Sequence, residues 1–435
     1  MTNQDLLNRS LQKVWHPCTQ MKQHEALPLI PICSGDGMWL TDVEGKRYLD
    51  AVSSWWVNLF GHNNLRIKDA IKQQLDCLEH VMLAGFTHEP VVLLSEKLSH
   101  LTGLGHAFYA SDGASATEIA LKMSFHYWRN SGKPAKNKFI SLQNSYHGET
   151  LGALGVTDVA LFKDIYAPLL MQSAQMPSPD FRLAEAGESA EAFALRCAEA
   201  LEEYISAHHA TLAAFIVEPL VQCAAGMGMY DAIYIKRARE ICDRYHVHLI
   251  ADEIAVGFGR TGTLFACEQA QIKPDFICLS KGITGGYLPL STVLTTDEVY
   301  AAFYDDTTIK GFLHSHSYTG NPLACSAALA TLAIFESDDV IRHNRQTTIA
   351  INEKMQALTD LPIQHLRNKG MIWALDVVTD NTTFSTACYQ QALQHGLLLR
   401  PIGKTVYFMP PYIISEAEIN FMVHTTRLSI EQSYA

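Results

Sequence analysis

The sequence predicts an α/β protein with a largely parallel central sheet covered by helices on both faces. Through the middle of the chain, short apolar runs rich in β-branched residues alternate with longer segments of helical period. Such alternation is typical of parallel strands joined by helical connections. The chain has 435 residues, of which 48% are hydrophobic, so it can bury a large core. The predicted strands are 138–142, 212–217, 247–251 and 276–279.

The two ends of the chain differ from this middle region. Turn signals (SGDG, DVEG) and short strand-like pieces occupy the N-terminal part, whereas a long helical stretch followed by short apolar runs resembles a small α+β unit near the C-terminus. We therefore expect an N-terminal arm and part of a small domain over 1–60, a large domain over 61–330, and the rest of the small domain over 331–435.

Composition excludes several classes of protein. The formal net charge of −12, without a basic stripe, argues against nucleic acid or an anionic membrane as a partner. No apolar run is long enough to span a bilayer, and the first twenty residues lack the pattern of a signal peptide, so we expect a cytoplasmic protein. Ten scattered cysteines without a CxxC pair indicate reduced thiols.

Charged residues directly follow the predicted strands. Glu218, Asp252 with Glu253, and Lys281 come at or just after three successive apolar runs. Ligands of open α/β sheets bind beyond the carboxyl ends of the strands, so we expect these side chains to converge there. One such charge is usually a solvated loop residue, but three in succession, one of them a lysine, favour a functional site.

A lysine in such a crevice suggests covalent chemistry. Burial lowers the pKa of a lysine toward the neutral amine, which forms an imine with an aldehyde such as pyridoxal 5'-phosphate (PLP). The ring of PLP withdraws electrons only while its nitrogen is protonated, which requires a fixed carboxylate partner. Lys281 and Asp252 fit these two roles. The pair alone does not single out PLP.

A phosphate also needs a binding site, and the segment 111–118 (SDGASATE) offers one before a helical run. Gly113 would open the helix, whose N-terminal backbone N–H groups suit an anion. Ser115 and Glu118 have the spacing of a capping box. A plain capped helix is the alternative.

A second candidate for phosphate is the segment 314–321 (HSHSYTGN), through the hydroxyls of Ser315 and Ser317. Its two histidines lack a carboxylate or cysteine at ligand spacing, so we expect no metal.

Two aromatic positions are candidates for ligand contacts. Tyr146, in the polar turn 144–148 (NSYHG), could stack on a planar cofactor, although an ordinary surface turn is as compatible with the pattern. Trp55 and Trp56 are either core residues or walls of an apolar substrate pocket.

Four segments resemble the class III PLP-dependent aminotransferases, and the resemblance runs nearly end to end. The segments are VEP at 217–219, ADEIAVGFGRTG at 251–262, LSKGITGGYLPLS at 279–291 and YTGNPLAC at 318–325. The resemblance implies the fold type I of PLP-dependent transferases, in which a large domain with a mostly parallel sheet is joined by a smaller α+β domain built from both termini. It also implies a homodimer with shared active sites.

Other segments resemble the family members that aminate 8-amino-7-oxononanoate to 7,8-diaminononanoate in biotin biosynthesis, with S-adenosylmethionine as the usual amino donor. These segments are WHPCTQM at 15–21, SSWWVNLFGH at 53–62, SDGASATEIALKM at 111–123 and RPIGKTVYFMPPYII at 400–414.

The resemblance assigns roles at the cofactor. Lys281 would hold PLP as a Schiff base and carry the proton during transamination, while Asp252 would pair with the pyridine nitrogen. Tyr146 would stack on the ring. The backbone N–H groups of Gly113 and Ala114 would bind the phosphate, and Ser317 of the partner subunit would reach the same phosphate.

The resemblance also assigns roles at the substrate. Trp55 would line the pocket, Arg400 would hold the carboxylate of the oxononanoate, and Arg260 would lie near the substrate. Cys18 and Ser315 stand where other members carry a tyrosine and a glycine, and both positions are expected near the substrate. These departures leave open whether the donor is S-adenosylmethionine or lysine.

Three alternatives stay open on the sequence. A class III aminotransferase acting on ornithine, 4-aminobutyrate or a similar ω-amine would share the cofactor site. A racemase or mutase of the same fold would need no second amino acceptor. A non-enzymatic protein with this fold would be expected to lose Lys281 or Asp252, and both are present.

Overall fold

The computed structural model describes residues 1–434, and the chain divides into two compact units. The first unit comprises Met1–Leu65, Thr347–Leu366 and the chain from Ala374 onward. The second unit comprises Arg66–Gln346 and Arg367–Trp373. The domain boundaries expected at residues 60 and 330 stay predictions.

The second unit contains a seven-stranded sheet of order β4-β12-β11-β10-β7-β5-β6. β11, β10, β7, β5 and β6 are parallel to one another, and β12 is antiparallel to β11 and β4. The predicted α/β class with a mostly parallel sheet is therefore confirmed, and the four predicted apolar runs are β5, β7, β10 and β11. The strands are β4 (His106–Ala110), β5 (Lys138–Leu142), β6 (Ala174–Met176), β7 (Leu212–Val217), β10 (His248–Asp252), β11 (Phe276–Leu279) and β12 (Ser291–Thr295).

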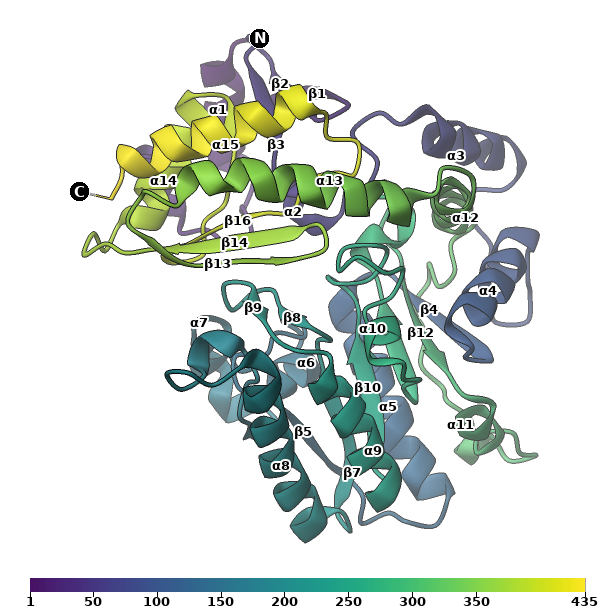
Figure 1. The fold of residues 1–435 in the computed structure, drawn as a ribbon. Coiled ribbons are helices and arrows are strands. Elements are labelled where there is room, and N and C mark those ends of the chain that lie inside the picture. The colour runs from purple at the N-terminus through teal and green to yellow at the C-terminus, as the bar shows by residue number, and fades with distance from the viewer. Residues whose placement is uncertain (435) are drawn as a thin grey trace. The chain divides into compact units, whose positions relative to one another are not determined.

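Helices cover both faces of this sheet (Figure 1). α8 and α9 pack with β5, β7 and β10 in one apolar cluster, and α5 packs on the opposite face in another. Every residue of β7 is buried, as expected for a central strand with helices on both sides. The helices of this unit are α3 (Leu65–Cys77), α4 (Glu89–Thr102), α5 (Gly113–Asn130), α6 (Leu151–Val156), α7 (Ala160–Lys163), α8 (Ala190–His208), α9 (Ile233–Tyr245), α10 (Cys267–Ala270), α11 (Asp297–Ala301) and α12 (Pro322–Ser337), and a short hairpin joins β8 (Val221–Gln222) to β9 (Gly228–Met229).

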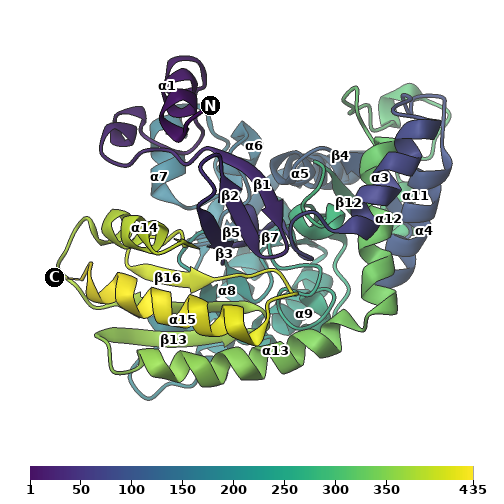
Figure 2. The same cartoon turned by 90° about the horizontal axis from the view of Figure 1, so that it is seen from above.

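The first unit contains a sheet of order β1-β2-β3-β15 and most of a sheet of order β13-β14-β16. Figure 2 shows α14 and α15 of this unit side by side. Its strands are β1 (Ile32–Asp36), β2 (Trp39–Asp42), β3 (Arg47–Asp50), β15 (Leu397–Leu398) and β16 (Thr405–Phe408), and β13 (Ile363–Lys369) and β14 (Ile372–Val377) have residues in both units. Its helices are α1 (Asn3–Lys13), α2 (Ser53–Trp56), α14 (Phe384–Gln394) and α15 (Glu416–Glu431), and α13 (Val340–Met355) has residues in both units.

None of the helices within residues 1–434 is both long and apolar enough to cross a membrane.

Candidate active site

Three charged side chains meet at the carboxyl edge of the large sheet. Glu218 follows β7, Asp252 ends β10, and Lys281 lies two residues beyond β11, in a short helical turn. Because β7, β10 and β11 are parallel neighbours, their carboxyl ends lie at one edge. The charges of Asp252 and Glu218 both act on the ammonium of Lys281. The structure thus brings together three of the four residues that the sequence expected to converge. The fourth, Glu253, instead accepts hydrogen bonds from Ala266 N and Cys267 N, at the start of α10.

The amine of Lys281 is prepared for nucleophilic chemistry. Desolvation lowers the pKa of this amine, and the charges of Asp252 and Glu218 only partly oppose the effect. The backbone of Lys281 is left-handed, with φ at 46°. Left-handed backbone at a residue other than glycine is uncommon and gathers at functional sites. A lysine of lowered pKa is the group that adds to an aldehyde.

Asp252 forms a buried pair with His147. Its Oδ2 lies 2.7 Å from His147 Nδ1, and its Oδ1 accepts a hydrogen bond from Ile254 N at 3.1 Å. Both side chains are almost fully buried. Within residues 1–434, no partner is found for His147 Nε2. A carboxylate fixed in this way suits a protonated ring nitrogen. Sequence reasoning missed His147, although it adjoins Tyr146 in the turn 144–148.

Glu218 holds the turn that carries Tyr146. Its carboxylate accepts hydrogen bonds from Tyr146 N at 3.0 Å and from Cys223 N at 3.2 Å. Burial raises the pKa of Glu218 to about 7. The hydroxyl of Tyr146 donates to Glu149 at 2.8 Å, and its ring meets Phe162 edge to face. Tyr146 therefore stands at the carboxyl edge of β5, beside β7, where a planar ligand could stack on its ring.

The cap of α5 differs from the one that the sequence predicted. Asp112 is the N-cap, and its carboxylate accepts hydrogen bonds from Ser115 N at 2.9 Å and Ser115 Oγ at 2.8 Å. The predicted capping box of Ser115 and Glu118 is wrong, because the helix begins before Ser115. Glu118 instead accepts a hydrogen bond from Gly152 N at 2.8 Å.

The start of α5 offers two backbone donors. The N–H groups of Gly113 and Ala114 have no hydrogen-bond partner in the described part of the chain. A Cβ atom at Gly113 would lie 2.9 Å from Ile254 Cγ2, and one at Gly148 would lie 2.5 Å from the Cβ of Ala114. Both glycines therefore allow the start of α5 to approach Ile254, just beyond β10, and the turn that carries Tyr146. Free N–H groups at a helix N-terminus suit a phosphate.

These residues fit PLP. The amine of Lys281 suits the aldehyde, the carboxylate of Asp252 suits the ring nitrogen, and the amides of Gly113 and Ala114 suit the phosphate. Among the described residues, no group of three His, Cys, Asp or Glu side chains could hold a metal ion.

The remaining predicted residues of the second unit lie in different environments. Arg260 is only 1% exposed, and its charge acts on the buried thiol of Cys223, as the charges of Lys281 and Asp252 do. Ser315 and Ser317 are exposed. Between them, His316 Nε2 lies 3.3 Å from Ser111 Oγ, at the end of β4 in the same chain.

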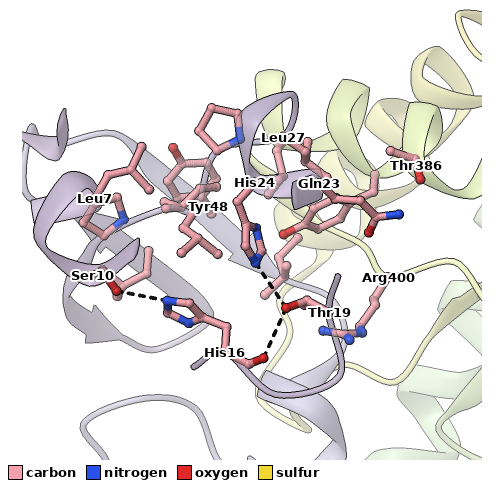
Figure 3. A pocket seen from close by; sticks show the side chains of 18 of the residues that line it. Leu7, Ser10, His16, Thr19, Gln23, His24, Leu27, Tyr48, Thr386 and Arg400 are labelled. Carbon is pink, nitrogen blue, oxygen red and sulfur yellow. Dashed lines mark hydrogen bonds between the residues drawn. The ribbon is translucent and has the colours of Figure 1, made fainter. Parts of the chain in front are cut away.

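Trp55, Arg400 and Cys18 belong to the first unit. The guanidinium of Arg400 lies 4.0 Å from the ring centroid of Trp55, and within residues 1–434 Arg400 has no carboxylate partner. Arg400 and Cys18 line a mostly apolar cavity of about 710 Å³ (Figure 3). His16 and His24, which the sequence did not single out, line the same cavity. His16 Nε2 lies 3.0 Å from Ser10 Oγ, and His24 Nε2 lies 3.1 Å from Thr19 Oγ1.

Comparison with known proteins identifies the family. Residues 20–428 match the model of the class-III aminotransferases. The adenosylmethionine-8-amino-7-oxononanoate aminotransferase of Helicobacter pylori is 47% identical over 96% of this chain and 95% of its own length. The enzyme of that name from Geobacter sulfurreducens is 40% identical over 98% and 97%.

Solved structures are similar over the whole chain. The crystal structure of the adenosylmethionine-8-amino-7-oxononanoate aminotransferase from Methanocaldococcus jannaschii matches with a TM-score of 0.93 and 35% identity, over 100% of both chains. An omega transaminase from Pseudomonas jessenii, solved in complex with PMP, matches with a TM-score of 0.93 and 30% identity over 98% of each chain.

Proposed function

The chain belongs to the class-III aminotransferases, which depend on PLP, and from this we propose that it transfers an amino group from S-adenosylmethionine to 8-amino-7-oxononanoate. The product would be 7,8-diaminononanoate, a precursor of biotin. We place the reaction in the cytoplasm.

The residues at the edge of the large sheet would carry the chemistry. Bound PLP supplies an aldehyde and a ring that accepts the electron pair left when the donor carbon loses its proton. Lys281 Nζ would hold the cofactor and then move that proton. Asp252, supported by His147, would keep the ring nitrogen protonated, and the amides of Gly113 and Ala114 would hold the phosphate. Tyr146 would cover one face of the ring.

Arg400 is the observation that carries the choice of acceptor. A guanidinium stacked on Trp55 and without a carboxylate partner in residues 1–434 is suited to a carboxylate ligand. The cavity that Arg400 lines is mostly apolar, which suits a hydrocarbon chain that ends in a carboxylate. We assign the carboxylate and chain of 8-amino-7-oxononanoate to Arg400 and Trp55, with Arg260, Cys18 and Ser315 near the substrate.

We also propose a homodimer with shared active sites. The segment 309–318, which carries Ser317, has three large apolar or aromatic side chains that are exposed in the single chain. Ile309 is 88% exposed, Leu313 80% and Tyr318 65%. Exposed apolar residues gathered on one segment favour an interface. A second copy would cover them, and Ser317 of the partner subunit would reach the phosphate.

The absorbance spectrum of the bound cofactor tests donor and acceptor separately. We expect S-adenosylmethionine alone to remove the absorbance band of the lysine-bound cofactor, and 8-amino-7-oxononanoate to restore it. In a ping-pong reaction the enzyme holds the transferred group after the donor has left and before the acceptor binds. Lysine is tested in the same way, because the departures at Cys18 and Ser315 leave it open as the donor. A band that neither donor changes would contradict the proposed reaction and favour an ω-amine such as ornithine or 4-aminobutyrate.

A further inference from the structure

The turn that presents Trp55 has an unusual backbone. Ser53, Ser54, Trp55 and Trp56 have φ values of 51°, 46°, 73° and 74°. Left-handed backbone is sterically unfavourable for an L-residue, and none of the four is glycine. The element α2 is therefore a left-handed turn that neighbouring residues must hold in place.

Two side chains anchor this turn to the core of the first unit. Ser53 Oγ donates to Met409 O at 2.7 Å, and Trp56 Nε1 donates to the hydroxyl of Tyr407 at 3.1 Å. Ser53 and Trp56 are both buried. Trp55, between these anchors, is 41% exposed and lies against the guanidinium of Arg400.

The third attachment is a buried carboxylate. Asp50 is fully buried at the end of β3, and its Oδ2 accepts hydrogen bonds from Ser54 Oγ at 2.7 Å and from His62 Nε2 at 3.1 Å. Its Oδ1 accepts a hydrogen bond from Val52 N at 3.2 Å. Ser54 is the only one of these donors whose side chain belongs to the turn.

The backbone of His62 is held by residues outside the turn. This backbone exchanges two hydrogen bonds with Gly37, at 2.7 and 3.1 Å. A Cβ atom at Gly35 would lie 2.8 Å from the Cβ of His62, so the two residues are closely packed. Asn58 Nδ2 lies 3.2 Å from His62 Nδ1, which favours the tautomer with hydrogen on Nε2. In that tautomer His62 donates to Asp50 and orients the carboxylate toward Ser54.

We propose that Asp50 and His62 are positioning residues, which act through Ser54 to hold the left-handed turn and so fix Trp55 beside Arg400. Trp55 provides the flat surface on which Arg400 lies, so movement of Trp55 would displace the guanidinium. The role in substrate binding rests on the proposed function, which assigns the acceptor's carboxylate to Arg400. Holding of the turn does not depend on the identity of the substrate.

Ser54→Ala and a matched pair of variants at His62 test this proposal. His62→Gln keeps an amide N–H that can donate to Asp50, whereas His62→Phe keeps a ring and loses the donor. Both Ser54→Ala and His62→Phe remove a hydrogen bond to the carboxylate of Asp50, which would release the turn and displace Arg400. We expect each variant to raise the KM for 8-amino-7-oxononanoate about tenfold, the size expected for loss of a hydrogen bond to a charged group, with kcat changed less than about twofold. His62→Gln should stay near the wild-type KM.

Hydrogen exchange of the amides of Trp56 and Val57 provides a readout without substrate, because both donate within the turn, to Val52 O and Ser53 O. We expect faster exchange in Ser54→Ala and His62→Phe than in the wild type and His62→Gln. Unchanged exchange, or faster exchange with an unchanged KM, would overturn the proposal. If the wild type does not use 8-amino-7-oxononanoate, the proposed function fails. In that case, hydrogen exchange of Trp56 and Val57 and the KM for the substrate that the wild type does use test whether Asp50 and His62 are positioning residues.

Discussion

Lys281 is the residue on which turnover depends most directly. Its amine would act first as nucleophile and then as proton carrier, so a single substitution removes both functions. We expect Lys281→Ala to lower turnover by at least about 10⁴-fold, which is the upper range for loss of a general base alone. Steady-state assays check this, with thermal unfolding as the control for folding. Retention of more than a trace of activity would contradict the assigned role.

His147 supports the cofactor through Asp252. His147→Phe keeps an aromatic ring but leaves Oδ2 of a buried carboxylate without its donor at 2.7 Å. Loss of such a bond costs about 1–3 kcal/mol, so we expect PLP to bind about 5- to 150-fold more weakly. Titration of the cofactor-free protein with PLP measures the change. Thr117→Val, which removes only a hydrogen bond to the backbone oxygen of His147, is the control and should change affinity less.

The residues of the site differ in how far the sequence could predict them. Glu218, Asp252 and Lys281 could be placed because each comes at or just after a short apolar run, and the ends of such runs are visible locally. The pairing of His147 with Asp252 joins residues 105 positions apart. It depends on the order of β10, β7 and β5, which local patterns do not contain. The contact of Glu218 with Tyr146 N depends on the same strand order.

At the scale of elements, Glu253 links the end of β10 to the start of α10. Its carboxylate is fully buried and accepts hydrogen bonds from Ala266 N at 2.6 Å and Cys267 N at 2.8 Å. Burial raises the pKa of Glu253 to about 7 despite these donors. Between its ordinary pKa and pH 7 the folded protein binds more protons than the unfolded chain. The free energy of unfolding therefore falls as pH rises through this window.

Glu253→Gln should remove this part of the pH dependence. We expect the fall in unfolding free energy from pH 4.5 to pH 8 to be smaller in the variant by roughly 1–3 kcal/mol. Chemical denaturation of both proteins across this range measures the slopes, and Glu218, which titrates in both, cancels from the comparison. Parallel curves for the two proteins would contradict the prediction.

Elements also differ in how visible they are in the sequence. β5, β7, β10 and β11 could be predicted because each is a short buried run between helical segments. The antiparallel direction of β12 depends on pairing with β11 and β4, which no local pattern reveals. The left-handed turn α2 was not predictable either. Its sequence, SSWW, contains no glycine, and the turn is held by partners as distant in sequence as Met409.

At the scale of the whole molecule, the sequence does not separate the core of one chain from an interface between two. Ile309, Leu313 and Tyr318 are apolar or aromatic in either case, and only the structure shows them exposed. The segment that carries them also carries Ser317, and it contacts Ser111 of its own chain through His316. Whether Ser317 serves its own subunit or the partner therefore needs a test that distinguishes the two.

Mixed dimers provide that test. Lys281→Ala removes the amine, and Ser317→Asp places a carboxylate where the phosphate would be repelled, so each variant alone should be nearly inactive. If Ser317 acts across the dimer, a mixed dimer contains one site with both native residues. Random pairing of equal amounts should then restore about a quarter of wild-type activity, because half of the dimers are mixed and each has one intact site of two. Two different affinity tags isolate the mixed dimers. If Ser317 acts within its own chain, both sites of a mixed dimer are defective, and isolated mixed dimers without activity would contradict the shared site.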